Sequence, residues 1–183
     1  MLTQDGFLLV ATPQAPLAYL DAVVLVAVHG EEGSMGFALH APSSQRLADL
    51  LPPRGIDPGP RAAQHAWRGG RTRPDVGWML FDARAVEPPE DSCLLTPEIG
   101  VTAAPHAMEA ILGAEVPAMV LMGHVGWEPG ELEEELAGGA WVRADADAGV
   151  VFEAPASRRW SEATCLALEL PRPWLGAPRF ATA

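Results

Sequence analysis

The chain of 183 residues contains no lysine and no asparagine. All 12 basic residues are therefore arginines, and against 24 acidic residues they leave a formal net charge of −12. Without lysine, a phosphate-binding loop that depends on a lysine and a Schiff-base mechanism are both excluded. The negative charge repels nucleic acid on average, so DNA binding requires a concentrated basic patch.

Cysteine and long apolar runs are also scarce. Cys93 and Cys165 are the only cysteines, and two of them make neither a disulfide framework nor a zinc quartet, so we interpret both as reduced thiols. The longest apolar runs, 22–28 and 118–122, are too short to span a bilayer, and no basic region precedes the first apolar residues. These features predict a cytoplasmic protein with no membrane partner.

What the chain does have is enough apolar material for one core. Hydrophobic residues make up 49% of it and its mean hydropathy is +0.10, as in a globular protein. We expect one compact domain over residues 1–170. A Gly- and Pro-rich stretch at 54–60 marks the start of a possible inserted subdomain at about 54–92, and 171–183 reads as a tail, loosely attached or docked by Trp174.

Hydrophobic patterning gives the expected elements. Strands are expected over 6–11, 21–29, 35–41, 63–68, 77–84, 117–124, 141–144 and 150–153, with 94–102 extended. Helices are expected around 47–51, capped by Ser43 or Ser44, and over 105–112, 129–138 and the segment after Ser157. This irregular order predicts an α+β fold, a mixed α/β sandwich in which helices flank a sheet of mixed strand direction.

The most distinctive motif is an aromatic turn that opens into an acidic helix. Trp127 precedes Pro129, which suits a first helical position; glutamates then fill the helix, and Gly138 ends it. One interpretation is a solvated acidic face anchored by two leucines. Our leading hypothesis is a non-catalytic contact with a basic protein partner through this surface, because an acidic patch beside an exposed aromatic suits such a partner. Its candidate residues are Trp127, Glu131, Glu134 and Glu135, with His124 nearby.

Two alternatives remain open. The segment 67–73, WRGGRTR, carries Arg68, Arg71 and Arg73 around a glycine turn, which predicts an anion or nucleic-acid contact unless the arginines pair with acids such as Asp75. The second alternative is a small hydrolase or metal-dependent enzyme. It would use Glu131, Glu135 and His124, but two carboxylates are a thin ligand shell, and we predict no metal and no cofactor. No G-x-S-x-G, H-E-x-x-H or G-x-G-x-x-G motif occurs.

Several blocks of the sequence together resemble the YqgE/AlgH family. They read GFLLVATP, VVLVAVHGEEGSMGFALHAP, WRGGRTRPDVGWMLF, LLTPEIGV, LMGHVGWEPGELEEELAGGAWV and VFEAPASRRW, and the strongest is 123–141. The resemblance implies a compact mixed α/β fold with a smaller inserted subdomain, found in the bacterial cytoplasm. Members are often labelled transcriptional regulators, but the family supplies no established catalytic residues.

The chain also departs from the family pattern. Asp21 stands where the family usually has Arg, His40 stands where Asn is typical, and Arg71–Thr72 replaces a usual Pro-Val. If those positions serve binding in the family, we expect that function to be altered here.

Overall fold

The computed structural model describes residues 5–171, which form ten strands, four α-helices and four short helical turns. The strands are β1 (Phe7–Ala11), β2 (Val23–Gly30), β3 (Gly33–Ala38), β4 (Pro42–Arg46), β5 (His65–Arg68), β6 (Thr72–Asp82), β7 (Ser92–Thr96), β8 (Ile99–Thr102), β9 (Ala118–Trp127) and β10 (Trp141–Asp145). The helices are η1 (Leu17–Tyr19), α1 (Leu47–Leu50), η2 (Pro52–Arg54), η3 (Gly59–Arg61), α2 (Pro105–Gly113), α3 (Glu131–Ala137), η4 (Gly149–Glu153) and α4 (Ala156–Ala167). The tail predicted for 171–183, Trp174 included, lies outside the described residues except for Pro171.

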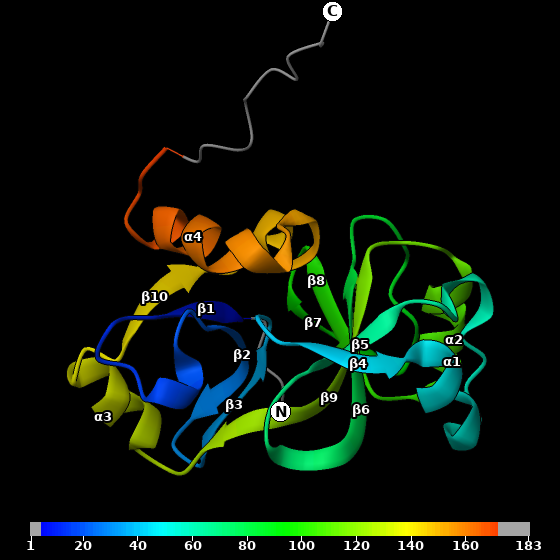
Figure 1. Cartoon of the computed structure of the whole chain (residues 1–183), viewed down its shortest axis with the longest axis horizontal. Coiled ribbons are helices and arrows are strands. Elements are labelled where there is room, and N and C mark those ends of the chain that lie inside the picture. The colour runs from blue at the N-terminus through cyan, green and yellow to red at the C-terminus, as the bar shows by residue number, and fades with distance from the viewer. Residues whose placement is uncertain (1–4, 172–183) are drawn as a thin grey trace, which may run out of the picture.

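The strands make one strongly curled sheet in the order β10-β1-β2-β3-β9-β6-β8-β7, with β4 and β5 beside it (Figure 1). Every pairing is antiparallel except that of β5 with β9, which is parallel. The long strand β9 joins the two halves of the sheet, because its end pairs with β3 and its beginning with β6. The fold is therefore broadly α+β, as predicted, while the sandwich arrangement and the inserted subdomain at 54–92 stay predictions.

Both faces of the sheet are covered around β1 and β2. All five residues of β1 are buried; its even-numbered side chains belong to a core beneath α4 and its odd-numbered ones to a core beneath α3. A strand covered on both faces reads as a continuous apolar run rather than an alternating one, which is what made β1 and β2 visible in the sequence. A third core lies between β6, β9 and helices α1 and α2.

The paired glycines Gly69–Gly70 mark a close crossing of backbones. The Gly69 N–H donates to the carbonyl of Met122 at 2.8 Å. A β-carbon on Gly69 would overlap the Gly123 carbonyl, and one on Gly70 would overlap the backbone of His124. These glycines are therefore required for packing against β9, since no larger residue fits there.

Two local predictions were wrong. Residues 150–153, expected as a strand, form the π-helix η4, because the carboxylate of Asp147 accepts the Val150 N–H at 2.8 Å and holds the start of the turn. The serines expected to cap the first helix lie in β4 instead, and α1 begins after Arg46 without a side-chain cap. None of the helices within residues 5–171 is long and apolar enough to cross a membrane.

Arg159 of α4 is a buried cation that ties three segments together. Its Nε donates to the Val150 carbonyl at 3.1 Å, and its two terminal nitrogens donate to the carbonyls of Leu39 and Ala154. The guanidinium carbon lies 4.7 Å from the centre of the Trp67 ring. Burial lowers the pKa of Arg159 to about 10, so the group stays charged at neutral pH.

Arg159→Ala should lower the free energy of unfolding by roughly 3–5 kcal/mol, because two buried carbonyls and one partly buried carbonyl lose their donor. Arg159→Lys should lose less, since an ammonium still donates to part of the set. Urea unfolding followed by tryptophan fluorescence measures both, with the exposed Arg68→Ala as a control that we expect to change stability by less than about 0.5 kcal/mol. A loss for Arg159→Ala as small as that of the control would contradict this role.

Candidate functional site

The acidic helix α3 forms where the sequence predicts it but begins two residues later, at Glu131. Gly130, with φ of +82°, is its N-cap residue, so Pro129 lies before the helix rather than at its first position. The Glu131 carboxylate accepts the N–H of Glu128 at 2.9 Å, which satisfies a donor at the helix start. Leu132 is fully buried and anchors the helix on the sheet.

Glu135 anchors the same helix through a polar contact. One carboxylate oxygen, Oε2, accepts the indole N–H of Trp127 at 2.9 Å and that of Trp141 at 2.6 Å. Trp127 is only 7% exposed, so the prediction of an exposed aromatic at this position was wrong. The Trp127 ring can pack into the core because Glu135 accepts its indole N–H there. The Glu135 carboxylate therefore helps to hold the fold.

A second chain of contacts joins α3 to the β2–β3 hairpin. The ring nitrogen Nδ1 of His29 lies 2.8 Å from the Ser34 hydroxyl, and Nε2 lies 3.8 Å from the Glu133 carboxylate. Phe7 meets the His29 ring edge-on at 5.6 Å. Ser34 is 8% exposed and lies between β2 and β9, so these contacts brace the hairpin against the helix rather than present a nucleophile.

The backbone of the turn η1 lies beside α3 (Figure 1), and two leucines in and just after this turn are exposed. Leu17 is 85% exposed and Leu20 is 53% exposed. Tyr19 between them packs on Trp141, with ring centres 5.4 Å apart. Burial raises the pKa of Tyr19, and Glu135 and Glu131 raise it further, while Arg71 lowers it. The turn, the acidic helix and Arg71 are thus close enough to interact electrostatically.

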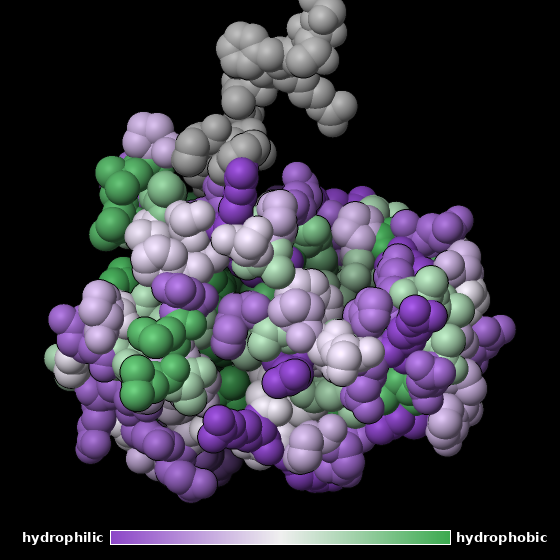
Figure 2. Space-filling view, viewed as in Figure 1, coloured by the Kyte–Doolittle hydropathy of each residue, from purple (hydrophilic) through white to green (hydrophobic). Residues whose placement is uncertain are grey.

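We call Leu17, Leu20, Glu131 and Glu134 the η1–α3 face. Glu131 and Glu134 are exposed, and at spacing i,i+3 they lie on one side of the helix. Figure 2 shows hydrophobic side chains surrounded by hydrophilic ones on this part of the surface. The sequence interpretation missed Leu17 and Leu20, because PLAYLD between two strands looked like a connection rather than a surface.

The three arginines predicted for an anion contact all lie on the surface, around the β5–β6 turn. Within residues 5–171 no carboxylate, including that of Asp75, forms an ion pair with Arg68, Arg71 or Arg73. Their charges are therefore uncompensated at short range.

His124 lies away from the acidic residues with which it was grouped. Its ring meets the ring of Trp78 edge-on at 6.2 Å, and burial, followed by the charge of Arg73, lowers the pKa of His124. In the part of the chain that the structure describes, no three His, Cys, Asp or Glu side chains form a group able to hold a metal ion. The geometry therefore does not assemble Glu131, Glu135 and His124 into one site.

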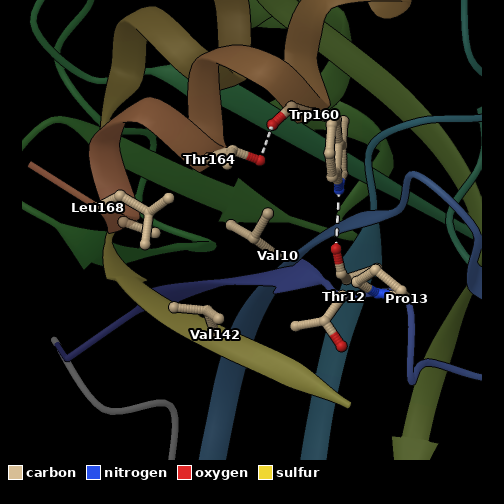
Figure 3. A pocket seen from close by; sticks show the side chains of 9 residues that line it. Val10, Thr12, Pro13, Val142, Trp160, Thr164 and Leu168 are labelled. Carbon is tan, nitrogen blue, oxygen red and sulfur yellow. Dashed lines mark hydrogen bonds between the residues drawn. The ribbon is translucent and has the colours of Figure 1, made fainter. Parts of the chain in front are cut away.

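An apolar pocket of about 240 Å³ lies between α4 and strands β1 and β10 (Figure 3). Val10, Val142, Trp160 and Leu168 line it, and the Trp160 indole N–H donates to the Ala11 carbonyl at 2.9 Å beside it. No titratable side chain lines this pocket. It therefore offers apolar contact rather than acid–base chemistry.

Glu135→Ala should destabilise the fold by about 2–4 kcal/mol, since two indole N–H groups lose their acceptor. Glu135→Gln keeps an oxygen acceptor and should cost less. Chemical unfolding measures the difference, and Glu134→Ala, an exposed position on the same helix, is the matched control. Equal stability of Glu135→Ala and Glu134→Ala would rule out the anchoring role.

Tyr19 is the chain's single tyrosine, so ultraviolet titration of tyrosinate reports it directly. The midpoint should lie above the ordinary value of about 10. Glu135→Gln should move it down and Arg71→Ala should move it up, because each removes one charge of opposite sign. The pKa of Tyr19 is higher in the folded chain than in the unfolded chain. The stability that the neutral phenol contributes is therefore lost as the pH rises through the folded-state pKa. A midpoint unmoved by both variants would contradict the arrangement.

Comparison with known proteins supports the resemblance noted in the sequence. Residues 8–168 match the family described as AlgH-like. A UPF0301 protein of Anaeromyxobacter sp. (strain K) is 32% identical over 168 residues, 86% of this chain and 84% of its own. Another from Stenotrophomonas maltophilia is 34% identical over 163 residues, 85% of each chain.

Two solved structures are similar as well. The solution structure of AlgH from Pseudomonas aeruginosa has a TM-score of 0.75 at 26% identity, covering 92% of this chain and 90% of that one. The crystal structure of protein DIP2367 from Corynebacterium diphtheriae has a TM-score of 0.69 at 22% identity, covering 91% and 87%, a likeness of fold. With its sequence matched from the first strand to the last helix, the chain belongs to the AlgH-like family.

Proposed function

We propose that the protein acts in regulation by binding a partner protein, and that the η1–α3 face receives a partner segment carrying basic and apolar side chains. The observation behind this proposal is the strong exposure of Leu17 and Leu20 on either side of Tyr19, which packs on Trp141, the hydrogen-bond partner of Glu135 in α3. Exposed apolar side chains rimmed by charge are typical of binding surfaces. Apolar contact then supplies affinity, and the carboxylates select a basic partner.

The surroundings of the face favour the same partner. Glu31 and Glu32 are exposed in the β2–β3 turn, whose Gly33 abuts the backbone of Trp127 and Glu128 just before α3. The net charge of −12 adds a long-range attraction for a basic molecule, which salt screens. We place this activity in the bacterial cytoplasm, where Cys93 and Cys165, both free thiols, would remain reduced.

Direct contact with nucleic acid is the alternative proposal. It rests on Arg68, Arg71 and Arg73, which are exposed and lack ion pairs within residues 5–171. The protein's overall negative charge opposes it.

The test is fluorescence anisotropy with a labelled amphipathic peptide of alternating arginine and leucine at low salt. Glu131→Lys with Glu134→Lys should weaken binding at least about tenfold, since two attractive charges become repulsive. Leu17→Ser with Leu20→Ser should weaken it by a similar factor through lost apolar contact.

Matched variants control for net charge and for exposed leucines elsewhere. Glu87→Lys with Glu90→Lys changes the charge equally, and Leu168→Ser with Leu170→Ser changes two other exposed leucines. Equal effects of face and control variants would refute the proposal.

The same titration with a labelled 20-base-pair DNA tests the alternative proposal of nucleic-acid binding. Salt-dependent binding that is lost in Arg68→Ala with Arg71→Ala would favour the alternative, and absence of binding at low salt would remove it.

A further inference from the structure

Strand β10 ends the sheet on one side. Within residues 5–171 it pairs with β1 alone, so the backbone groups on its other side have no strand beside them. An unpaired edge is a template for a further strand. The exposed side chains here are Val142, Arg143 and Asp145.

The register with β1 determines which backbone groups point outward. Thr12 N–H donates to the Ala140 carbonyl, and the pairing continues through Val10 opposite Val142 and Leu8 opposite Ala144. Antiparallel pairs alternate between bonded and non-bonded. The even-numbered residues of β10 therefore bond to β1, and the N–H and C=O groups of Arg143 and Asp145 face the open edge.

We propose that this edge binds the β10 of a second copy of this chain, antiparallel and centred on Ala144. A two-fold axis perpendicular to the sheet keeps each side chain on the same face of the joined sheet. Odd-numbered residues of one β10 can therefore stand opposite only odd-numbered residues of the other, and even-numbered opposite even-numbered. Centring on Arg143 would oppose two arginines, and centring on Asp145 would oppose two aspartates. Centring on Ala144 places Arg143 of each copy opposite Asp145 of the other.

This register satisfies charges as well as backbone groups. The same two residues that carry the outward backbone groups, Arg143 and Asp145, carry the opposite charges, so each bonded pair is also an ion pair. Within the described chain neither side chain has an ion-pair partner. The Arg143 guanidinium lies over the Phe7 ring, 3.9 Å from its centre. Asp145 pairs with Phe7 across the two strands, so the side chains of Arg143, Asp145 and Phe7 all lie on the same face of the sheet.

The other face of the edge is apolar. Val142 and Leu168 line the pocket between α4 and β10 and, with Leu170 nearby, are among the most exposed large hydrophobic side chains of the described residues. Figure 2 shows hydrophobic residues gathered at this end of α4, and Figure 3 shows Val142 and Leu168 on opposite walls of the pocket. The same two-fold axis puts both copies' α4 helices on one side of the joined sheet, where these apolar residues cover each other.

Sedimentation equilibrium of the full chain tests the dimer, which should have about twice the monomer mass of 19.4 kDa and weaken at high salt. Arg143→Glu and Asp145→Arg should each raise the dimer dissociation constant at least about tenfold, because each turns both ion pairs into repulsions. The double variant should restore the wild-type value to within about threefold, since both pairs re-form with their charges exchanged.

Circular dichroism confirms that the single variants remain folded, and rescue by the double variant separates a register effect from damage to the fold. A chain that is monomeric up to about millimolar concentration overturns the proposal. So does a dimer that is insensitive to the single reversals or is not rescued by the double one. Glu131→Lys with Glu134→Lys should leave the dimer unchanged, so this inference and the proposed partner binding fail independently.

Discussion

The candidate surface depends on one carboxylate oxygen, Oε2 of Glu135, which accepts the indole N–H of both Trp127 and Trp141. The tryptophans end β9 and begin β10, and β1, β2 and β3 lie between these strands in the sheet. In a flat sheet four strand spacings separate them by about 19 Å. Their meeting at one oxygen therefore requires the sheet to curl, and Glu135 holds α3 across the curl.

Polar anchoring explains why an amphipathic helix of seven residues is stable in this position. A helix this short has little stability of its own, so its packing must fix it. Leu132 supplies apolar burial, Glu135 supplies two hydrogen bonds, and Glu133 meets His29 of the hairpin. Glu131 and Glu134 remain exposed on the surface, although Glu131 also accepts the Glu128 N–H, so the acidic helix is both firmly held and accessible.

The predictable parts of the structure are those whose causes are local. The runs in β1 and β2 and the hairpin that follows arise from apolar patterning, and α3 from its acidic first turn and terminal glycines. The strand expected at 150–153 failed because two side chains outside the segment, Asp147 and Arg159, take up the N–H and the carbonyl of Val150. The exposure of Trp127 was misjudged for the same reason: its N–H partner lies eight residues away, on the far side of a turn.

The two proposed surfaces share this anchor. Trp141, which bonds to Glu135, is the first residue of β10, and Thr12 fixes the segment before it through the carbonyls of Gly139 and Ala140. The acidic helix and the sheet edge are thus consecutive along the chain and joined by a short glycine turn. Because the proposed partner contacts leave Glu135 in place, either surface can be occupied without altering the other. Only a change at the anchor itself moves the helix and the edge together.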